Sequence, residues 1–275
     1  MNKLYKNPVL GAIAGDMIGV PYEWYCKQGL QIPENFKLWT KDSHFSDDTV
    51  MTIAVAEWLL TPPFNKENLT KIMQKWGRKY RRAGYGHLFG QWIDSDDPKP
   101  YGSFGNGSAM RVSPVGCAFN TLETTLTMAE ESAAVSHNHP EGIKGAQCVA
   151  GMINYIRFNP PSGAIIAVAE QYYGKKFWKK TPKEIIESGY KFDSTCQGSV
   201  PEAICCFLYS NSYEETIRNA IMLRGDADTQ AAIAGSIAAA YWGIPDEIAI
   251  EAKDRLPDDM YDVFEEFSKK YDLDF

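Results

Sequence analysis

Hydrophobic positions recur at helical spacing along most of this chain. The segment after Asn65 shows the pattern best, with its apolar residues three or four positions apart at Leu69, Ile72, Met73 and Trp76. This is the spacing of one face of an α-helix. Runs of alternating β-branched residues bounded by turn signals, which would indicate strands, are missing from the sequence. The pattern therefore predicts an all-α protein.

Helix start signals divide the chain into many short elements. Asn7 followed by Pro8 is an N-cap before proline at the first helical position, and Pro140 has the same position in a second segment. The next helix begins at Asp47 or Asp48 and ends before Pro62. In full, helices are predicted over 8–20, 48–60, 66–82, 121–136, 140–158, 161–173, 182–188, 201–209, 213–223, 229–242, 246–254 and 258–270.

The longest stretch predicted to be non-helical spans residues 83–113 and is rich in Gly, Asp, Pro and aromatic residues. A loop of this length inside a compact domain is usually functional or disordered. Its aromatic residues argue against disorder; they are Tyr85, Phe89, Trp92, Tyr101 and Phe104. No low-complexity linker marks a boundary, so residues 1–275 are expected to form a single domain.

Two short segments rich in small residues echo one another. GAIAG occurs near residue 13 and AAIAG near residue 233. Two small-residue helices packed closely at the centre of the fold would explain the echo without any duplication.

The length and charge of the chain limit its function class. A single domain of 275 residues would bury roughly 75% of its unfolded surface, enough for a real core. The net charge of −7 argues against non-specific binding to nucleic acid or to an anionic membrane. A small anionic ligand held in a local positive pocket remains compatible with this charge.

The cysteines and the chain start indicate the compartment. The six cysteines have no C-x-x-C spacing, and Cys205 and Cys206 are adjacent within an apolar stretch, so reduced core thiols are expected. Asp16 interrupts the apolar run near the start and Glu23 follows soon after, so we expect a helix of the mature protein there rather than a signal peptide. The longest apolar run, 231–244, is shorter than the ~20 residues needed to span a bilayer. We expect a soluble, cytoplasmic, monomeric protein.

Two acidic clusters each open an apolar helix. One is Ser46-Asp47-Asp48 and the other contains Asp226, Asp228 and Thr229. Helix capping is the simpler interpretation of either cluster alone. A cap needs one oxygen, however, and each cluster supplies two carboxylates, which repel unless a cation or protons intervene. If the two helix starts converge, these six residues form an all-oxygen shell that suits Mg²⁺, Ca²⁺ or Mn²⁺ rather than zinc.

A glycine-rich segment, YGSFGNGSAMR at 101–111, is a third candidate. Closely spaced glycines let backbone N–H groups turn toward an anion, and Arg111 could add a contact to phosphate. The segment is neither a Walker A loop nor a dinucleotide-binding fingerprint. A surface turn with Arg111 in an ordinary salt bridge is the alternative.

The sequence SHNHP at 136–140 holds two histidines, His137 and His139. Their i, i+2 spacing would not place both on one helix face, which weighs against a paired metal site. For His139, helix capping is the preferred interpretation.

Together these segments resemble the ADP-ribosylglycohydrolase family. The matching pieces are GAIAGDMIGVPYEW, FSDDTVMTIAVAEWLL, GSFGNGSAMRVSPVG, SHNHPEGIKGAQ and GDADTQAAIAGSIAAAYWGIP, in the order of the family. The resemblance implies one all-α domain with a cleft for ADP-ribose and a centre of two Mg²⁺ ions, for which Mn²⁺ is an alternative. From the net charge, no nucleic-acid or membrane partner is expected.

The resemblance also assigns roles to individual residues. The implied metal ligands are Ser46, Asp47, Asp48, Asp226, Asp228 and Thr229. The implied ligand-binding residues are Gly102, Ser103, Phe104, Gly105, Asn106, Gly107, Ser108, Met110, Arg111 and His137. Glu23 matches a glutamate that gates or assists the reaction, and the general base is left open among Asp47, Asp48, Asp226 and Glu23.

The implied activity is hydrolysis of the glycosidic bond between ADP-ribose and a protein side chain, with arginine favoured. O-linked or small-molecule adducts are the alternative substrates, and a catalytically silent ADP-ribose-binding protein is the rival interpretation. Arg224 stands where the family commonly has glycine, so it is expected to reshape the metal loop or to contact a phosphate. Ala227, in place of Ser or Thr, is a milder change.

Overall fold

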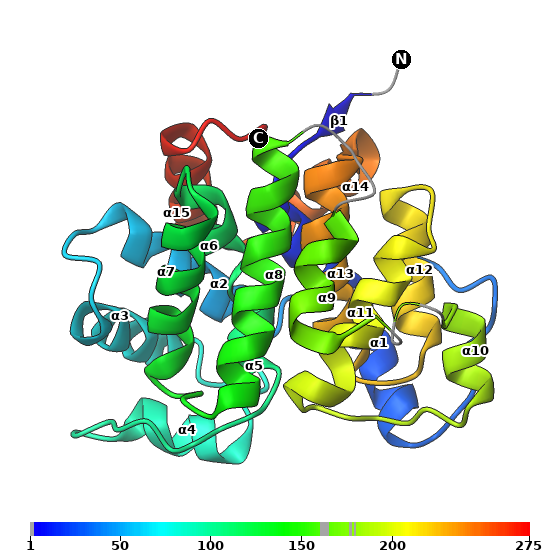
Figure 1. Ribbon diagram of the computed structural model, residues 1–275, viewed down its shortest axis with the longest axis horizontal. Coiled ribbons are helices and arrows are strands. Elements are labelled where there is room, and N and C mark those ends of the chain that lie inside the picture. The colour runs from blue at the N-terminus through cyan, green and yellow to red at the C-terminus, as the bar shows by residue number, and fades with distance from the viewer. Residues whose placement is uncertain (1–2, 160–164, 176–177, 179) are drawn as a thin grey trace.

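The structure, a computed structural model, describes residues 3–159, 165–175, 178 and 180–275. Helices dominate the described residues, as the sequence predicts (Figure 1). Two-residue strands, β1 (Leu4–Tyr5) and β2 (Ile244–Pro245), pair antiparallel, with Leu4 opposite Pro245. The sequence analysis did not predict this pair, because two residues are too few to show a strand pattern.

The centre of the fold is a close pair of helices, α1 (Pro8–Lys27) and α13 (Ala227–Tyr241). Asn7 caps α1 by accepting hydrogen bonds from the N–H groups of Val9 and Leu10, both at 3.1 Å. A Cβ added to Gly15 would lie 2.2 Å from the carbonyl oxygen of Ala231, so the two backbones are in contact there. The predicted packing of two small-residue helices is confirmed.

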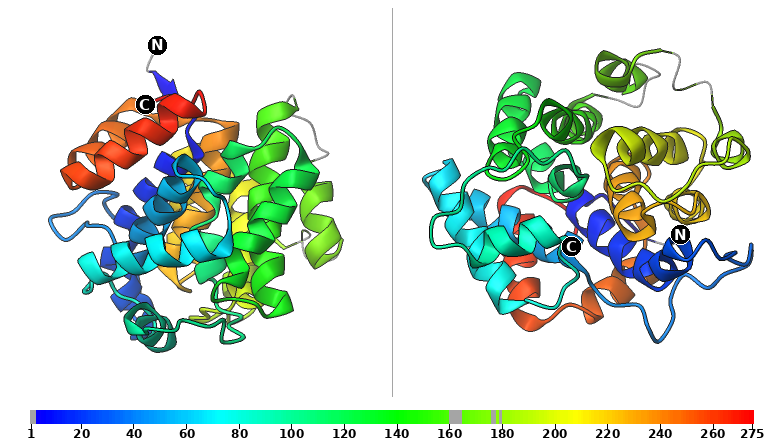
Figure 2. Two further views of the ribbon diagram at one scale, coloured as in Figure 1. Left: turned by 90° about the vertical axis from the view of Figure 1, so that its left-hand side faces the viewer. Right: turned by 90° about the horizontal axis from the view of Figure 1, so that it is seen from below.

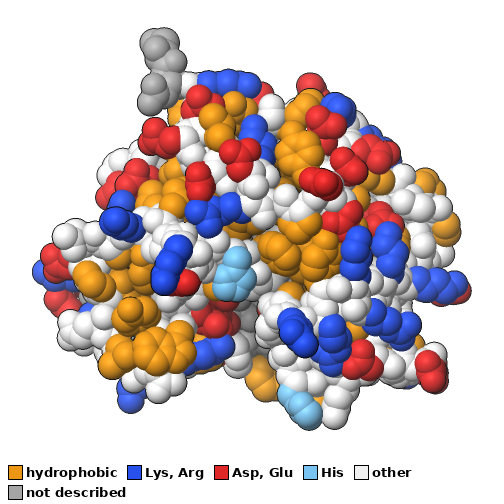
Figure 3. Space-filling view, turned by 180° about the vertical axis from the view of Figure 1, so that it is seen from behind, with side chains coloured by type: hydrophobic (Ala, Val, Ile, Leu, Met, Phe, Trp, Pro, Cys, Tyr) orange, Lys and Arg blue, Asp and Glu red, His pale blue; other side chains and the backbone are white. Residues whose placement is uncertain are grey.

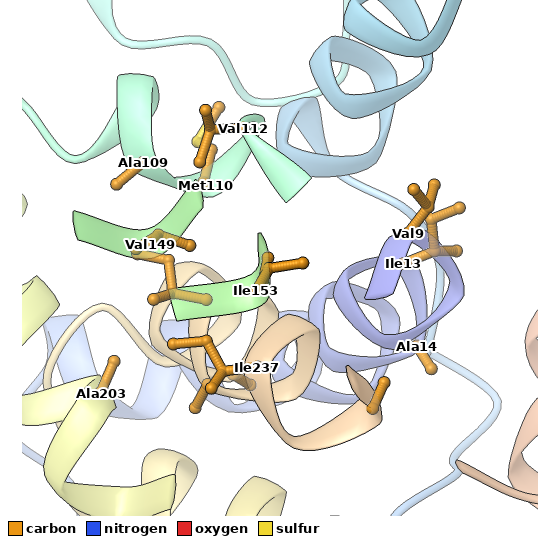
Figure 4. Close-up of a cluster of buried hydrophobic side chains, with 14 of the residues drawn as sticks. Val9, Ile13, Ala14, Ala109, Met110, Val112, Val149, Ile153, Ala203 and Ile237 are labelled. Atoms are coloured by element: carbon orange, nitrogen blue, oxygen red, sulfur yellow. The ribbon is translucent and has the colours of Figure 1, made fainter. Parts of the chain in front are cut away.

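A hydrophobic core surrounds this pair (Figure 4). Val9, Ile13 and Ile237 from the central helices face Val149 and Ile153 of α8 (Pro140–Phe158) in the close-up. All of these side chains are buried. Residues from distant parts of the chain thus fix α8 against the central pair.

Most remaining helices agree with the predicted ranges to within a few residues. They are α2 (Asp47–Leu60), α3 (Lys66–Lys79), α7 (Leu122–Ala134), α9 (Ile165–Tyr173), α10 (Pro182–Glu187), α12 (Tyr213–Met222), α14 (Asp246–Asp254) and α15 (Asp258–Lys270). Residues 161–164 of the predicted helix 161–173 lie outside the described residues.

Residues 83–113 are not wholly non-helical. They contain α4 (His87–Asp94), α5 (Gly107–Met110) and the start of α6 (Ser113–Ala118). These helices have four to eight residues, too few for a helical period to stand out among glycines and prolines. The prediction of one long loop was therefore wrong.

Two helix boundaries next to proline also differ from the prediction. α1 continues past Pro21 to Lys27, where Tyr22 and Cys26 remain buried. α11 (Cys196–Leu208) begins five residues before Pro201, because the Thr195 side chain caps it at Gly198 N (3.1 Å). The predicted ranges stopped before Pro21 in the first case and began at Pro201 in the second.

All six cysteines are buried with free thiols, as expected for a reduced core. None of the described helices is long and apolar enough to cross a membrane.

Candidate active site

The two acidic clusters meet at one place in the structure. Ser46 caps α2, its Oγ accepting a hydrogen bond from Asp48 N at 3.1 Å. Asp226 precedes α13, and Thr229 in its first turn donates from Oγ1 to Asp48 Oδ2 at 3.1 Å. This hydrogen bond joins residues 181 positions apart. The starts of α2 and α13 therefore converge.

Asp16 of α1 supports this junction from inside the fold and is fully buried. Its carboxylate accepts hydrogen bonds from Ser46 N (2.9 Å) and Ser46 Oγ (2.7 Å), and from Thr49 N (3.1 Å) and Thr49 Oγ1. From the sequence, Asp16 was interpreted only as a break in an apolar run, and no role was predicted for it. The available signal was a lone carboxylate inside a helix of small apolar residues.

Two groups of carboxylates have oxygens within 4.8 Å of one another in the described part of the chain. One group is Asp16, Asp48 and Asp228, and the other is Glu23, Asp226 and Asp228. Asp228 belongs to both, so the groups form one continuous acidic centre.

Asp47 belongs to neither group. Its backbone N–H donates to the carbonyl of Ala83 at 2.7 Å, and its Oδ1 faces Gly84, 3.4 Å from where a Cβ would stand. Asp47 thus lies at the side of the acidic centre, and its role as a metal ligand stays a prediction.

Burial makes the ionised form of these carboxylates costly. It raises the pKa of Asp226 to about 6, against the opposing hydrogen bond from Asn106. It raises the pKa of Asp47 to about 8, with Asp16 adding to the effect. Burial also raises the pKa of Asp48 and Asp228 far above their usual range, and neighbouring carboxylates add to it. A cation would let all of them ionise together.

The residues present fit a hard divalent cation. Asp48 Oδ1 is buried and has no hydrogen-bond partner among the described residues, which is costly for a carboxylate oxygen unless a cation binds it. The surrounding donors are all oxygens, the ligands that Mg²⁺ and Mn²⁺ prefer. Asp48, Asp226 and Asp228 would hold the ion. Ser46 accepts from Asp48 N and donates to Asp16, which leaves one lone pair of its hydroxyl for a ligand role.

A cavity of about 480 Å³ opens beside the acidic centre, within the size range of small-molecule sites. Its walls come from the end of α1, the segment before and within α4, the glycine-rich loop and the start of α13. These elements lie toward the lower edge of Figure 1, the edge that the right-hand view of Figure 2 faces. Seven of the predicted ligand-binding residues line the cavity: Ser103, Gly105, Asn106, Gly107, Met110, Arg111 and His137.

Three predicted ligand-binding residues are not among those that line the cavity, namely Gly102, Phe104 and Ser108. Ser108 is fully buried and donates its hydroxyl hydrogen to the Gly142 carbonyl at 2.7 Å. The Phe104 ring is 45% exposed and meets the His139 ring edge-on at 5.3 Å. Gly102 has φ 70°, the left-handed conformation that glycine permits. The roles of these three residues in ligand binding stay predictions.

The glycine-rich loop is held on two sides. Asn106 N donates to Ser194 O at 2.8 Å, and Cys196 N donates to Phe104 O at 2.8 Å. On the other side, Asn106 Nδ2 donates to Asp226 Oδ2 at 2.8 Å. The second bond connects the loop directly to the acidic centre.

Arg111 is fully buried and turned toward the interior. Its Nη2 donates to Ser132 O and Ser136 Oγ, each at 3.1 Å. No carboxylate pairs with it in the described residues, so the salt-bridge alternative is wrong. Burial lowers the pKa of Arg111 to about 10, and the side chain remains a cation. Direct contact with phosphate stays a prediction.

His139 has the capping role expected for it, because its Nδ1 accepts from Glu141 N at 3.1 Å at the start of α8.

Arg224 takes a left-handed backbone conformation, φ 61°. It does not line the cavity, so the expected contact with a bound phosphate is not supported by its position. Arg224 adopts a positive φ, as a glycine at this position could. It therefore does not reshape the loop by taking a negative φ.

Outside residues 83–113, the stretch already singled out as functional, three residues that line the cavity had no predicted role: Lys27, Phe192 and Ser194. Lys27 is ion-paired with Glu23, one helical turn earlier, and that i, i+4 spacing was an available signal. Its ammonium also lies 5.4 Å from the centre of the Phe192 ring. Nothing in the local sequence pattern marks Phe192 or Ser194, which reach the cavity through the anchoring of the glycine-rich loop.

Several known proteins are similar to this chain. ADP-ribosylhydrolase ARH3 of Mus musculus is 24% identical, over 96% of this chain and 92% of its own. ADP-ribosylarginine hydrolase Tri1 of Serratia proteamaculans is 23% identical, over 86% of this chain and 71% of its own. A solved structure described as an ADP-ribosylglycohydrolase-related protein complex superimposes with a TM-score of 0.68 at 20% identity, covering 96% of this chain and 98% of that one.

The sequence profile of the ADP-ribosylglycohydrolase family matches residues 4–273, nearly the whole chain. The match covers the convergent helix starts, the glycine-rich loop and the central helix pair in one alignment. The protein belongs to the ADP-ribosylglycohydrolase family.

Proposed function

We propose that the protein is a Mg²⁺-dependent hydrolase that removes ADP-ribose from modified protein side chains, with arginine as the main acceptor. The observation that carries this is the acidic centre at the starts of α2 and α13, placed on the wall of a cavity that the glycine-rich loop also lines. The relative from Serratia proteamaculans, named an ADP-ribosylarginine hydrolase, supports the choice of arginine.

The proposed binding mode places the distal part of ADP-ribose along the glycine-rich loop. Ser103, Asn106 and Gly107 line this side of the cavity. The reacting ribose then faces Asp48, Asp226 and Asp228, which also line the cavity. Contacts remote from the reacting carbon fix its position relative to the carboxylates, which lowers the entropic part of the barrier.

The reaction replaces the bond between the anomeric carbon and the side-chain nitrogen with a bond to a water oxygen. The transition state has oxocarbenium character, as in glycoside hydrolysis generally. Bound Mg²⁺ would orient the ribose hydroxyls and lower the pKa of a coordinated water. One carboxylate takes the proton of the attacking water, and the leaving guanidine nitrogen gains a proton. Glu23, Asp47, Asp48 and Asp226 are the candidates for this base.

Asp226→Ala tests the proposal. Removing this carboxylate takes away one oxygen of the acidic centre and the hydrogen-bond partner of Asn106. We expect release of ADP-ribose from an arginine-modified protein to fall by about 100-fold or more. Asp254→Asn, an exposed carboxylate at the end of α14, is the matched control. Full activity of Asp226→Ala in EDTA would refute the metal-dependent mechanism.

The acceptor is tested separately with a panel of arginine-, serine- and nucleic-acid-linked ADP-ribose. Hydrolysis of another linkage but not of the arginine linkage would favour the alternative substrates. The name of the mouse relative, ADP-ribosylhydrolase, specifies no acceptor and keeps this alternative in view. Binding of ADP-ribose in calorimetry without turnover of any substrate would favour a catalytically silent protein.

The expected compartment, oligomeric state and partners come from the sequence. We expect a cytoplasmic monomer that meets ADP-ribosylated proteins, releases ADP-ribose as product and binds neither nucleic acid nor membranes.

A further inference from the structure

His137 is buried beside the glycine-rich loop, with its two ring nitrogens facing different surroundings. A Cβ built on Gly107 would lie 2.9 Å from Nε2, and one built on Gly105 would lie 3.6 Å from it. On the other side of the ring, Nδ1 lies 2.8 Å from Ser136 Oγ. Nε2 thus faces the loop that lines the cavity, and Nδ1 faces the interior.

The direction of the hydrogen bond between Ser136 and His137 follows from Arg111. The guanidinium is a donor only, so its 3.1 Å contact with Ser136 Oγ uses a lone pair of that oxygen. Ser136 is fully buried, and its hydroxyl hydrogen needs an acceptor. Among the described residues the only other partner of Oγ is His137 Nδ1. The hydroxyl therefore donates to Nδ1.

A neutral imidazole carries one hydrogen, on one of its two nitrogens. With Nδ1 acting as an acceptor, that hydrogen is on Nε2. Burial and the nearby Arg111 charge hold the pKa of His137 far below its usual range, so the ring does not gain a second proton.

We propose that Arg111 and Ser136 are positioning residues that fix His137 in the tautomer with hydrogen on Nε2, so that this N–H donates to an acceptor oxygen of the ligand held by the glycine-rich loop. The matching ligand group is a phosphate oxygen or a ribose ring oxygen. The identity of that ligand rests on the proposed function, whereas the tautomer rests on the hydrogen bonds alone.

Arg111 suits this role because a guanidinium can only donate hydrogen bonds, so the direction of its hydrogen bond to Ser136 Oγ cannot be reversed. Its Nε and Nη1 have no hydrogen-bond partner in the described residues, and its guanidinium carbon lies 5.8 Å from the centre of the Phe89 ring. A hydroxyl or an amide at this place could act as donor or acceptor and would leave the tautomer undetermined.

Nitrogen-15 labelling of histidine tests the tautomer in the intact protein. The chain has four histidines, and the signals of His137 are identified as those missing from His137→Gln. We expect a protonated Nε2 and a bare Nδ1 in the wild type, and a mixture of tautomers in Ser136→Ala. A protonated Nδ1 or an imidazolium in the wild type at neutral pH would overturn the inference.

Ser132→Ala is the matched control for Ser136→Ala. Ser132 Oγ is also buried, one helical turn away, but has no hydrogen-bond partner among the described residues, and Arg111 contacts only its backbone carbonyl. We expect this variant to keep the wild-type tautomer.

Calorimetry with ADP-ribose and MgCl2 tests whether the tautomer of His137 contributes to ligand binding. Ser136→Ala should weaken binding roughly 5-fold, the effect of one neutral hydrogen bond. In a His137→Gln background the same change should have no effect, because a glutamine amide donates from near the Nε2 position without help from Ser136. Equal losses in both backgrounds would refute the positioning role. A correct tautomer in a protein that binds no ADP-ribose would refute the proposed function instead.

Discussion

Arg224 shows how one residue can keep an unfavourable backbone conformation. Its φ of 61° lies in the left-handed region, where a Cβ is crowded by the following carbonyl. Gly225 beside it is held by packing, since a Cβ there would lie 2.3 Å from Gln230 Oε1. Asp226 follows directly. The conformation of Arg224 is therefore imposed by the loop that presents Asp226.

Arg224→Gly should stabilise the protein. Glycine adopts this conformation without the steric cost, so we expect the free energy of unfolding to rise by about 1 kcal/mol, measured by urea denaturation. Asp272→Gly is the matched control, since Asp272 has φ 52° but aspartate tolerates this region better, and it should gain less. A loss of stability in Arg224→Gly would show that the arginine side chain makes contacts that outweigh the strain.

Glu202 of α11 should make stability depend on pH. Burial raises its pKa to about 7, and its Oε2 has no hydrogen-bond partner in the described residues. The folded state therefore binds the proton more tightly than the unfolded state. Stability is fully present below about pH 4.5 and falls as pH rises through about 7.

Glu202→Gln should remove this dependence. We expect the variant to match the wild type near pH 4.5 and to be more stable at pH 8 by up to about 2 kcal/mol. Thermal melting between pH 4 and 8 measures the difference. Glu123→Gln, an exposed glutamate of α7, should follow the wild-type curve. Parallel curves for wild type and Glu202→Gln would contradict the prediction.

At the scale of residues, sequence patterns predict site residues that stand in a cluster and miss a site residue that stands alone. Asp48 and Asp228 each stand in a cluster at a helix start, and this predicts their meeting. Asp16 accepts four hydrogen bonds at the same junction, yet it stands alone among apolar residues. Its partners, Ser46 and Thr49, are about 30 positions away, and nothing local indicates them.

At the scale of elements, the spacing of α1 and α13 determines where the acidic centre can form. Gly11, Gly15 and Gly19 lie one turn apart on α1, and a Cβ on any of them would lie within 2.5 Å of an atom of α13. At Gly19 that atom is the Cα of Asp228, at 2.4 Å. The close approach of the two helices thus extends to the acidic centre.

Gly15→Ala should force the two helices apart. The added methyl would stand 2.2 Å from the Ala231 carbonyl oxygen, a backbone atom that cannot rotate away. Overpacking of this kind costs about 1 to 3 kcal/mol, which outweighs the better helix propensity of alanine. Gly86→Ala is the control, since nothing lies within 4 Å of a Cβ there. Chemical denaturation of both variants measures the difference, and equal stability would contradict the packing.

Long helices were predictable and the short ones around the cavity were not. α8 and α15 were found at their predicted ranges because a helical pattern persists over 19 and 13 residues. α4 has eight residues and follows Gly86 without a side-chain cap. Its place depends on α3, where Arg78 Nε donates to the Ile93 carbonyl at 3.0 Å. Such tertiary contacts leave no periodic pattern.

At the scale of the whole molecule, the cavity joins segments from nearly the full length of the chain. Its lining begins at Glu23 and ends at Thr229. Charges of both signs are interspersed on the face shown in Figure 3, and the cations Lys71, Lys75 and Lys79 of α3 are each ion-paired. These ion pairs offset the positive charge along α3.

Magnesium should stabilise the folded protein as a whole. The acidic centre is assembled only in the folded state, so an ion that binds it shifts unfolding by mass action, about 2.7 kcal/mol at 100 times the Kd. We expect MgCl2 or MnCl2 to raise the Tm of the EDTA-treated protein, whereas NaCl of equal ionic strength should not. Asp228→Asn should lose this response and Asp254→Asn should keep it. An unchanged Tm of the wild type in both metals would contradict a cation site.

The close packing at Gly19 links the distance between α1 and α13 to the affinity of the acidic centre for a cation, two quantities that are usually measured separately. Asp228 moves with the backbone of α13, and Asp16 and Glu23 move with α1. A change in the distance between these helices therefore changes the distances among the carboxylate oxygens by a similar amount. Cation affinity should then serve as a gauge of interhelical spacing, so that a series of core substitutions along the α1–α13 contact can be ranked by metal titration alone.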